Sequence, residues 1–199
     1  LLAISNSVFI QKSQLGGGSP MIRGFATNRI LLVVDGVRMN NAIFRSGNLQ
    51  NVISLDANSI EEAEVIFGPG SVIYGSDAIG GIMDFHTLGG MLASTNEQIS
   101  FSAHAMARYS SANNEKTTHA DFNVGLNRWG FRTSITYADY DDLRMGSRGP
   151  EEYTRPDYVV REDGMDIMLI NSDPEVQAPS GYNQLNAMQK VRFQPNSFW

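Results

Sequence analysis

The second part of the chain alternates between apolar and polar positions, the pattern of strands that have one apolar and one polar face. Three such segments, 98–109, 117–127 and 131–138, follow one another with short turns between them, and a fourth runs over 185–193. In the second segment the apolar positions are Ala120, Phe122, Val124 and Leu126, and the polar face is His119, Asp121, Asn123 and Gly125. The alternation is typical of an outer-membrane barrel, whose apolar face meets lipid. A soluble β-sandwich alternates in the same way.

The first part of the chain predicts shorter strands. Ile30 to Val34 is a continuous apolar run, which fits a strand buried on both faces, and Asp35-Gly36 predicts the turn after it. Val8–Ile10, Ala63–Phe67 and Ile82–Thr87 are further strand candidates. Asn58 or Ser59 predicts the cap of a short helix.

The stretch from Glu61 to Thr87 contains several glycine-rich breaks between β-branched segments. It resembles the end of the plug domain of TonB-dependent outer-membrane receptors. That family carries the pattern Glu-x-Ile/Val-Glu-Val-x-x-Gly-Pro-x-Ser-x-x-Tyr-Gly-x-x-Ala-x-Gly-Gly. The matching residues here are Glu61, Glu64, Val65, Gly68, Pro69, Ser71, Tyr74, Gly75, Ala78, Gly80 and Gly81.

A second block agrees with the same family and comes in family order. Its residues are Ile22, Arg23, Gly24, Phe25, Asn28, Arg29, Asp35, Gly36, Val37, Arg38 and Asn40. One position departs from the pattern, because many relatives carry Arg or Lys where this chain has Phe67. In those relatives the basic residue joins a charge cluster between plug and barrel. The resemblance implies that such a cluster would rely here on Arg23 or Arg29.

The resemblance implies a transmembrane β-barrel with an N-terminal α+β plug domain. We expect an N-terminally incomplete plug over 1–87, a linker over 88–97, and the first barrel strands over 98–199. An irregular external loop is expected over 141–181, where Asp, Glu, Gly, Pro and Met are frequent. Four strands cannot close a plugged barrel of roughly 22 strands, so we expect the chain to be a fragment.

The implied function is TonB-dependent active uptake of an iron complex, siderophore or haem, across the bacterial outer membrane. The alternatives are import of another nutrient (a glycan, a peptide or a vitamin) and a signal-transducing receptor; a secreted β-rich adhesin or enzyme ranks below both. The implied partners are a TonB-type energy-transducing protein, whose contact segment we expect outside this chain, outer-membrane lipid, and a surface lipoprotein or host haem protein. We do not expect an enzyme.

Composition narrows these possibilities only slightly. The net charge of −6 argues against a nucleic-acid partner, because phosphate binding relies on Lys and Arg. The chain has no cysteine, which excludes disulfides and thiolate metal sites. The longest strongly apolar run, Ile30 to Val34, is far shorter than the ~20 residues of a membrane-spanning helix.

Two groups of residues are candidates for contact with a transported ligand. The resemblance places the first at the plug apex: Arg23, Met39, Asn40, Asn41, Phe44 and Arg45. Packing against the barrel is the alternative for these residues, and a salt bridge to the barrel wall is the favoured one for Arg23. The second group is His104 and His119, which are expected on the polar face of neighbouring strands.

These two histidines are able to touch each other or to bind haem iron. The simpler interpretation is that each bonds to its neighbours. No tightly bound cofactor or metal is expected. The loop acids Glu151, Glu152, Asp163 and Asp166 lack the spacing of a Ca²⁺ loop and are interpreted as solvated charge.

Overall fold

The computed structural model describes residues 8–14, 17–26, 29–39, 55–68, 74–75, 78–111 and 113–195. Seven residues predicted as contacts or motif positions lie outside these ranges: Asn28, Asn40, Asn41, Phe44, Arg45, Pro69 and Ser71. The chain divides into two compact units. One contains Leu1–His104, Ala120–Ile135 and Asn186–Trp199, and the other contains Ala105–His119 and Thr136–Leu185.

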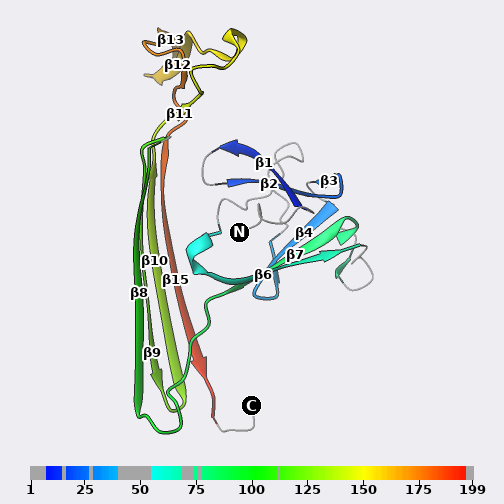
Figure 1. Cartoon of the computed structure of the whole chain (residues 1–199), viewed down its shortest axis with the longest axis vertical. Helices are drawn as coiled ribbons and strands as arrows, with labels where there is room; N and C mark the ends of the chain where they lie inside the picture. The colour runs from blue at the N-terminus through cyan, green and yellow to red at the C-terminus, as the bar shows by residue number, and fades with distance from the viewer. Residues whose placement is uncertain are drawn as a thin grey trace. The chain divides into compact units, whose positions relative to one another are not determined.

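The first unit contains a four-stranded sheet in the order β5-β4-β7-β6 (Figure 1). Its strands are β4 (Ile30–Val34), β5 (Val37–Arg38), β6 (Ile60–Phe67) and β7 (Gly81–Thr87). β4 pairs in parallel with β7, while the β4–β5 and β6–β7 pairs are antiparallel. Because β4 lies inside the sheet, both of its faces are available for burial, which explains its unbroken apolar sequence.

Both faces of this sheet carry an apolar cluster. Ile30 and Leu32 of β4 pack on one face with Met83 and Phe85 of β7. That cluster also includes Val8 and Ile22, from the three-stranded sheet formed by β1 (Val8–Gln14), β2 (Gly17–Ile22) and β3 (Phe25–Ala26). The other face buries Leu31, Val33, Ala78 and Ile82. Full burial of one such aliphatic side chain contributes about 1.5–3 kcal/mol, so the two clusters hold this part of the fold together.

The helix predicted near Asn58 is wrong. Ala57–Ser59 forms only a 3₁₀ turn, which Asp56 caps by accepting the Asn58 amide at 3.0 Å. The chain then enters β6 directly, and Glu62 and Glu64 alternate with Ala63 and Val65 as a strand requires. Ala63 pairs with Phe85 of β7 and Val65 with Met83, and both pack against the apolar cluster. Because these apolar positions repeat every two residues, the segment forms a strand rather than a helix.

The glycine pair Gly80-Gly81 at the start of β7 is required by close packing. A Cβ at Gly80 would lie 2.4 Å from Phe25 Cβ and 2.9 Å from the Arg29 carbonyl oxygen. The Gly80 amide donates to that same carbonyl at 2.7 Å. Gly81 has φ +144°, and a Cβ there would lie 2.9 Å from the Ile66 carbonyl oxygen. Neither position has room for a side chain, so this part of the plug motif has a structural cause.

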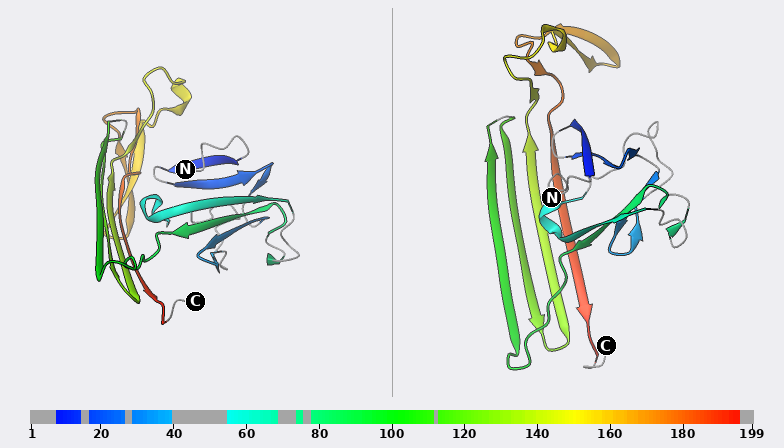
Figure 2. Two further views of the ribbon diagram at one scale, coloured as in Figure 1. Left: turned by 60° about the horizontal axis from the view of Figure 1, so that its bottom comes forward. Right: turned by 45° about the vertical axis from the view of Figure 1, so that its right-hand side comes forward.

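Four long strands form a second sheet in the order β15-β10-β9-β8 (Figure 2). They are β8 (Ile99–Ser110), β9 (Glu115–Leu126), β10 (Trp129–Tyr140) and β15 (Tyr182–Phe193). Each has 12 residues, which exceeds the 9–11 that a tilted strand needs to cross a bilayer. The four predicted strands are therefore present. β8 has the predicted length, shifted by one residue, and the other three are longer than their apolar–polar pattern indicated.

This sheet has the burial pattern of a membrane protein rather than a soluble one. The polar face of β9 and β10 is buried, including Asp121, Asn123, Arg132, Ser134 and Thr136. The apolar face is exposed: Phe122 is 41%, Ile135 49% and Leu185 68% exposed. In a soluble sandwich these two environments would be exchanged. A section of barrel wall in lipid accounts for both faces, as expected for a transmembrane β-barrel with a plug domain.

Aromatic pairs lie near both ends of the long strands. Trp129 packs against Phe193 with ring centroids 4.3 Å apart. Tyr140 stacks on Tyr182 at 4.7 Å. Such rings suit the two interfaces of a bilayer, where one side of the ring is apolar and the other is hydrated. In the described residues, no helix combines the length and the apolar character needed to cross a membrane.

The segment 141–181 is not irregular, contrary to the sequence-based expectation. It contains β11 (Leu143–Arg144), a 3₁₀ turn (Glu151–Tyr153), β12 (Asp157–Glu162), β13 (Met165–Ile170) and β14 (Val176–Gln177). β12 and β13 form a hairpin whose turn residues, Asp163 and Gly164, have φ of 50° and 81°. The Asp-Gly dipeptide favours this turn, and it is a signal that the sequence contains.

Candidate functional site

Two of the predicted plug-apex residues lie in the described part of the chain. Arg23 sits in the turn between β2 and β3, is exposed, and places its guanidinium carbon 5.0 Å from the centre of the Phe67 ring. Met39 follows β5, and its amide donates to the Leu32 carbonyl at 2.8 Å. Phe67 is the position where many relatives carry a base. Here the cation of Arg23 lies over that ring, an arrangement that is favourable by itself.

The plug-motif residues in the described part mainly build the fold. Gly24, Gly36, Gly68, Gly75 and Gly81 all have positive φ. Tyr74 packs against the second apolar cluster, and Glu64 is exposed on β6 opposite Asp84. Since most of these residues form turns or core contacts, the motif identifies the architecture and says little about the ligand.

Asp35 connects the plug sheet to β15. Its carboxylate accepts hydrogen bonds from the Thr87 amide at 2.9 Å and the Thr87 hydroxyl at 2.7 Å. Lys190 Nζ lies 2.9 Å from the same carboxylate and donates to the Thr87 carbonyl at 3.0 Å. Partial burial opposes ionisation of Asp35, but the hydrogen bonds from Thr87 and Lys190 outweigh it and lower its pKa.

The segment after β7 is held against the polar face of β9. Asn123 is 1% exposed; its Oδ1 accepts the Met91 amide at 2.9 Å and its Nδ2 donates to the Met91 carbonyl at 3.1 Å. A Cβ at Gly125 would lie 2.7 Å from that carbonyl oxygen. One amide side chain therefore satisfies both backbone groups of Met91, and the glycine beside it allows the close approach.

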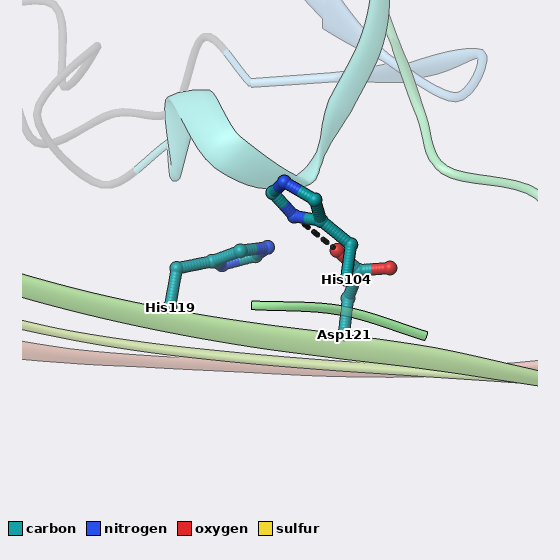
Figure 3. Close-up of side chains that lie close together, drawn as sticks. All are labelled: His104, His119 and Asp121. Atoms are coloured by element: carbon teal, nitrogen blue, oxygen red, sulfur yellow. Dashed lines mark ion pairs between the residues drawn. The ribbon is translucent and has the colours of Figure 1, made fainter. Parts of the chain in front are cut away.

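Two histidines and an aspartate converge on the polar face of β8 and β9 (Figure 3). One ligand atom from each of His104, His119 and Asp121 lies within 4.8 Å of the others. His104 Nδ1 lies 3.4 Å from Asp121 Oδ2, and Arg132 lies 2.6 Å from Asp121 Oδ1. His119 Nδ1 lies 2.6 Å from the Thr136 hydroxyl. Such a set of donors is able to hold a proton, a cation or the iron of a cofactor.

Sequence reasoning named both histidines but not Asp121 or Arg132. Asp121 is two residues after His119, so the strand period places both on one face of β9. That signal was available in the alternation. The third histidine, His86, lies 3.8 Å from Asp84 on β7 and is not a member of the cluster.

Comparison with known proteins indicates the same architecture as the fold, a plug domain followed by barrel strands. Residues 1–82 match the family model for the TonB-dependent receptor plug domain. These residues form a plug domain of the TonB-dependent receptor family. A vitamin B12 transporter, BtuB of Vibrio vulnificus, is 44% identical over 82 residues, which is 39% of this chain and 13% of that protein. Heme/hemopexin utilization protein C of Haemophilus influenzae is 38% identical over 96 residues, 48% of this chain and 13% of that protein.

Solved receptor structures match nearly the whole chain. The copper transporter OprC superposes with a TM-score of 0.67 at 18% identity, covering 96% of this chain and 25% of OprC. The FrpB iron transporter of Neisseria meningitidis superposes with a TM-score of 0.64 at 14% identity, covering 96% and 26%. At these identities the likeness concerns the fold. The receptor's place is the bacterial outer membrane, and its relatives are transporters and receptors rather than enzymes.

Proposed function

We propose that this receptor carries out TonB-dependent active uptake of an iron complex, either a siderophore or haem. The observation that carries the proposal is a plug sheet bonded to a β-sheet whose apolar face is exposed and whose polar face is buried. A wall that separates lipid from a polar interior suits this distribution, and a plug sheet bonded to such a wall supports gated passage. The chain spans about an eighth of the curated relatives it matches, so the activity is proposed for the whole receptor.

Support for an iron cargo comes from one relative, the heme/hemopexin utilization protein, which is 38% identical over 96 residues. The convergent His104 and His119 also suit an iron-containing ligand, because imidazole is a common haem ligand. Vitamin import is the second candidate, and it is favoured by the 44% identity with a vitamin B12 transporter. Glycan or peptide import and signal transduction have no comparable support here.

The proposed partners follow from the same family. A TonB-type energy-transducing protein would act on the receptor from the periplasmic side, and outer-membrane lipid would cover the exposed apolar face. A surface lipoprotein or a host haem protein would deliver the cargo if it is haem. Asn40, Asn41, Phe44 and Arg45 remain the proposed plug contacts for that cargo, together with Arg23 and Met39.

The test uses the full-length receptor purified from outer membranes. Haem, a ferric siderophore mixture and a corrinoid are titrated separately, and binding is followed by absorption and by iron or cobalt content. Uptake of the ligand that binds is then measured in cells with and without the energy-transducing protein. Saturable binding of haem or a ferric siderophore at one equivalent, with energy-dependent uptake, is expected. Saturable corrinoid binding alone would overturn the iron assignment in favour of vitamin import.

The plug contacts are tested in the same titration. Arg45→Ala and Phe44→Ala are expected to weaken ligand binding at least tenfold, because each removes a charge or a ring from the proposed apex. Arg128→Ala, an exposed arginine in the short turn before β10, is the matched control and is expected to leave affinity unchanged. Unchanged affinity in both apex variants would remove these residues from the site.

A further inference from the structure

We infer that His104, His119 and Asp121 form a binding site for one divalent transition-metal ion on the polar face of β8 and β9. The inference goes beyond the proposed uptake of an iron complex, because it concerns a bare ion held by the protein's own side chains. It rests on the arrangement of the three donors and of the groups that hold them (Figure 3).

The donor set selects the class of ion. Two imidazoles and one carboxylate suit Zn²⁺, Cu²⁺, Ni²⁺ or Fe²⁺, whereas Ca²⁺ and Mg²⁺ prefer sites made entirely of oxygen. One donor atom from each residue lies within 4.8 Å of the others, so modest side-chain rotation brings all three onto one ion. Three protein ligands leave a fourth position for water or for a donor atom of another molecule.

The spacing of His104 and Asp121 fits two ligands of one ion. Their closest atoms, Nδ1 and Oδ2, are 3.4 Å apart. A charge-assisted hydrogen bond between such groups is shorter, about 2.7–2.9 Å. Ligand bonds of about 2.0–2.1 Å in a tetrahedral site place neighbouring donor atoms roughly 3.4 Å apart. The observed separation matches this distance, so both atoms can bind one ion with little rearrangement.

The two buried ligands are held from behind, as metal ligands usually are. Arg132 contacts Asp121 through Oδ1, which leaves Oδ2 directed toward His104. The Thr136 hydroxyl contacts His119 through Nδ1, so an ion would bind this imidazole through Nε2. These contacts fix the orientation of a carboxylate oxygen and of an imidazole nitrogen before any ion arrives.

Burial gives the site a fixed part and an accessible part. His119 and Asp121 are each 4% exposed, while the His104 side chain is 66% exposed. An ion can therefore reach the pair on β9 from the side of His104, which then closes over it as the third ligand. Arg132 already compensates the charge of Asp121, so the site would hold the ion moderately and release it, as a transport pathway requires.

The experiment uses the full-length receptor in detergent, stripped of metal with a chelator and titrated with Co²⁺ and then Zn²⁺. We expect one equivalent of Co²⁺ to produce the visible absorption bands of a four- or five-coordinate site, and Zn²⁺ to displace it. His104→Ala is expected to weaken Co²⁺ binding at least tenfold without affecting folding, because the side chain is exposed. His86→Ala, which removes a histidine outside the cluster, is the matched control and should bind normally.

A second variant separates positioning from ligation. Thr136→Val keeps all three ligands but removes the hydroxyl that orients His119, and a 10- to 100-fold loss of affinity is expected. The melting temperature of each metal-free variant, compared with that of the natural protein, shows whether the variant still folds. Absence of a stoichiometric Co²⁺ signal in the natural protein would overturn the inference, as would a His104→Ala variant that binds normally. Metal binding without iron-complex uptake would leave this site in place and refute the proposed function instead.

Discussion

Replacing Asn123 by Ala tests how firmly the segment after β7 is attached to the sheet. The change removes both hydrogen bonds to Met91, at 2.9 and 3.1 Å, and leaves the amide and the carbonyl of that residue without partners on the protein side. A buried group left unsatisfied costs about 1–3 kcal/mol. Water can reach part of the Met91 backbone because its side chain is exposed, so we take about 1–3 kcal/mol for both bonds together.

The loss of these hydrogen bonds predicts local opening of the segment around Met91 rather than global unfolding of the receptor. A change of about 1–3 kcal/mol corresponds to a roughly 5- to 150-fold rise in the exchange rate of the Met91 amide hydrogen, because each 1.4 kcal/mol is about tenfold. The assay is hydrogen exchange of the full-length receptor in detergent, read at peptides that contain Met91. Asn127→Ala, in the exposed turn after β9, is the control. Equal exchange at Met91 in both variants would refute the attachment by Asn123.

Three other changes test separate parts of the structure. Asp35→Asn should remove an acid-sensitive contribution to stability. Because folding lowers the pKa of Asp35, its ionised carboxylate stabilises the fold above the ordinary value near 3.8, and this contribution is lost as the pH falls through the lower folded pKa. The melting temperature of the variant, measured from pH 5 to 2, should therefore depend less on pH than that of the natural protein. Gly125→Ala should destabilise by about 1–3 kcal/mol because its Cβ would meet the 91–93 backbone, whereas Gly146→Ala, in open space, should not. Arg144→Ala should speed proteolysis of 141–181, since Arg144 contacts Asp173 at 2.6 Å and Glu175 at 3.0 Å, and protection equal to the natural chain would contradict that role.

The long strands were predictable because their signal is local. A period of two is readable within one strand, and the aromatic and β-branched residues at the exposed positions reinforce it. The hairpin of β12 and β13 carried a local signal as well, in Asp163-Gly164, but the many charges around it hid the alternation. The composition of 141–181 therefore indicated a loop where the structure has the β12–β13 hairpin and the β11–β14 pair.

The contacts of the candidate site were not predictable in the same way. Alternation places His119 and Asp121 on one face, but it does not give the register that brings His104 beside them or Arg132 behind them. The bond between Asp35 and Lys190 joins residues far apart in the sequence, and nothing near either residue indicates the other. Such pairings depend on how separate strands are aligned, which local patterns do not contain.

The two attachments between the plug and the long strands differ in physical character, and that difference implies an order of release. Asp35 and Lys190 form a charged contact that is partly exposed, so separating them returns both charges to water at little cost. Asn123 is buried and satisfies two backbone groups, so releasing Met91 leaves polar groups unpaired. The Thr87 amide, which Asp35 holds, should therefore exchange faster than the Met91 amide, and raised salt should speed only the former. Slower exchange at Thr87 than at Met91 in the natural receptor would contradict this order.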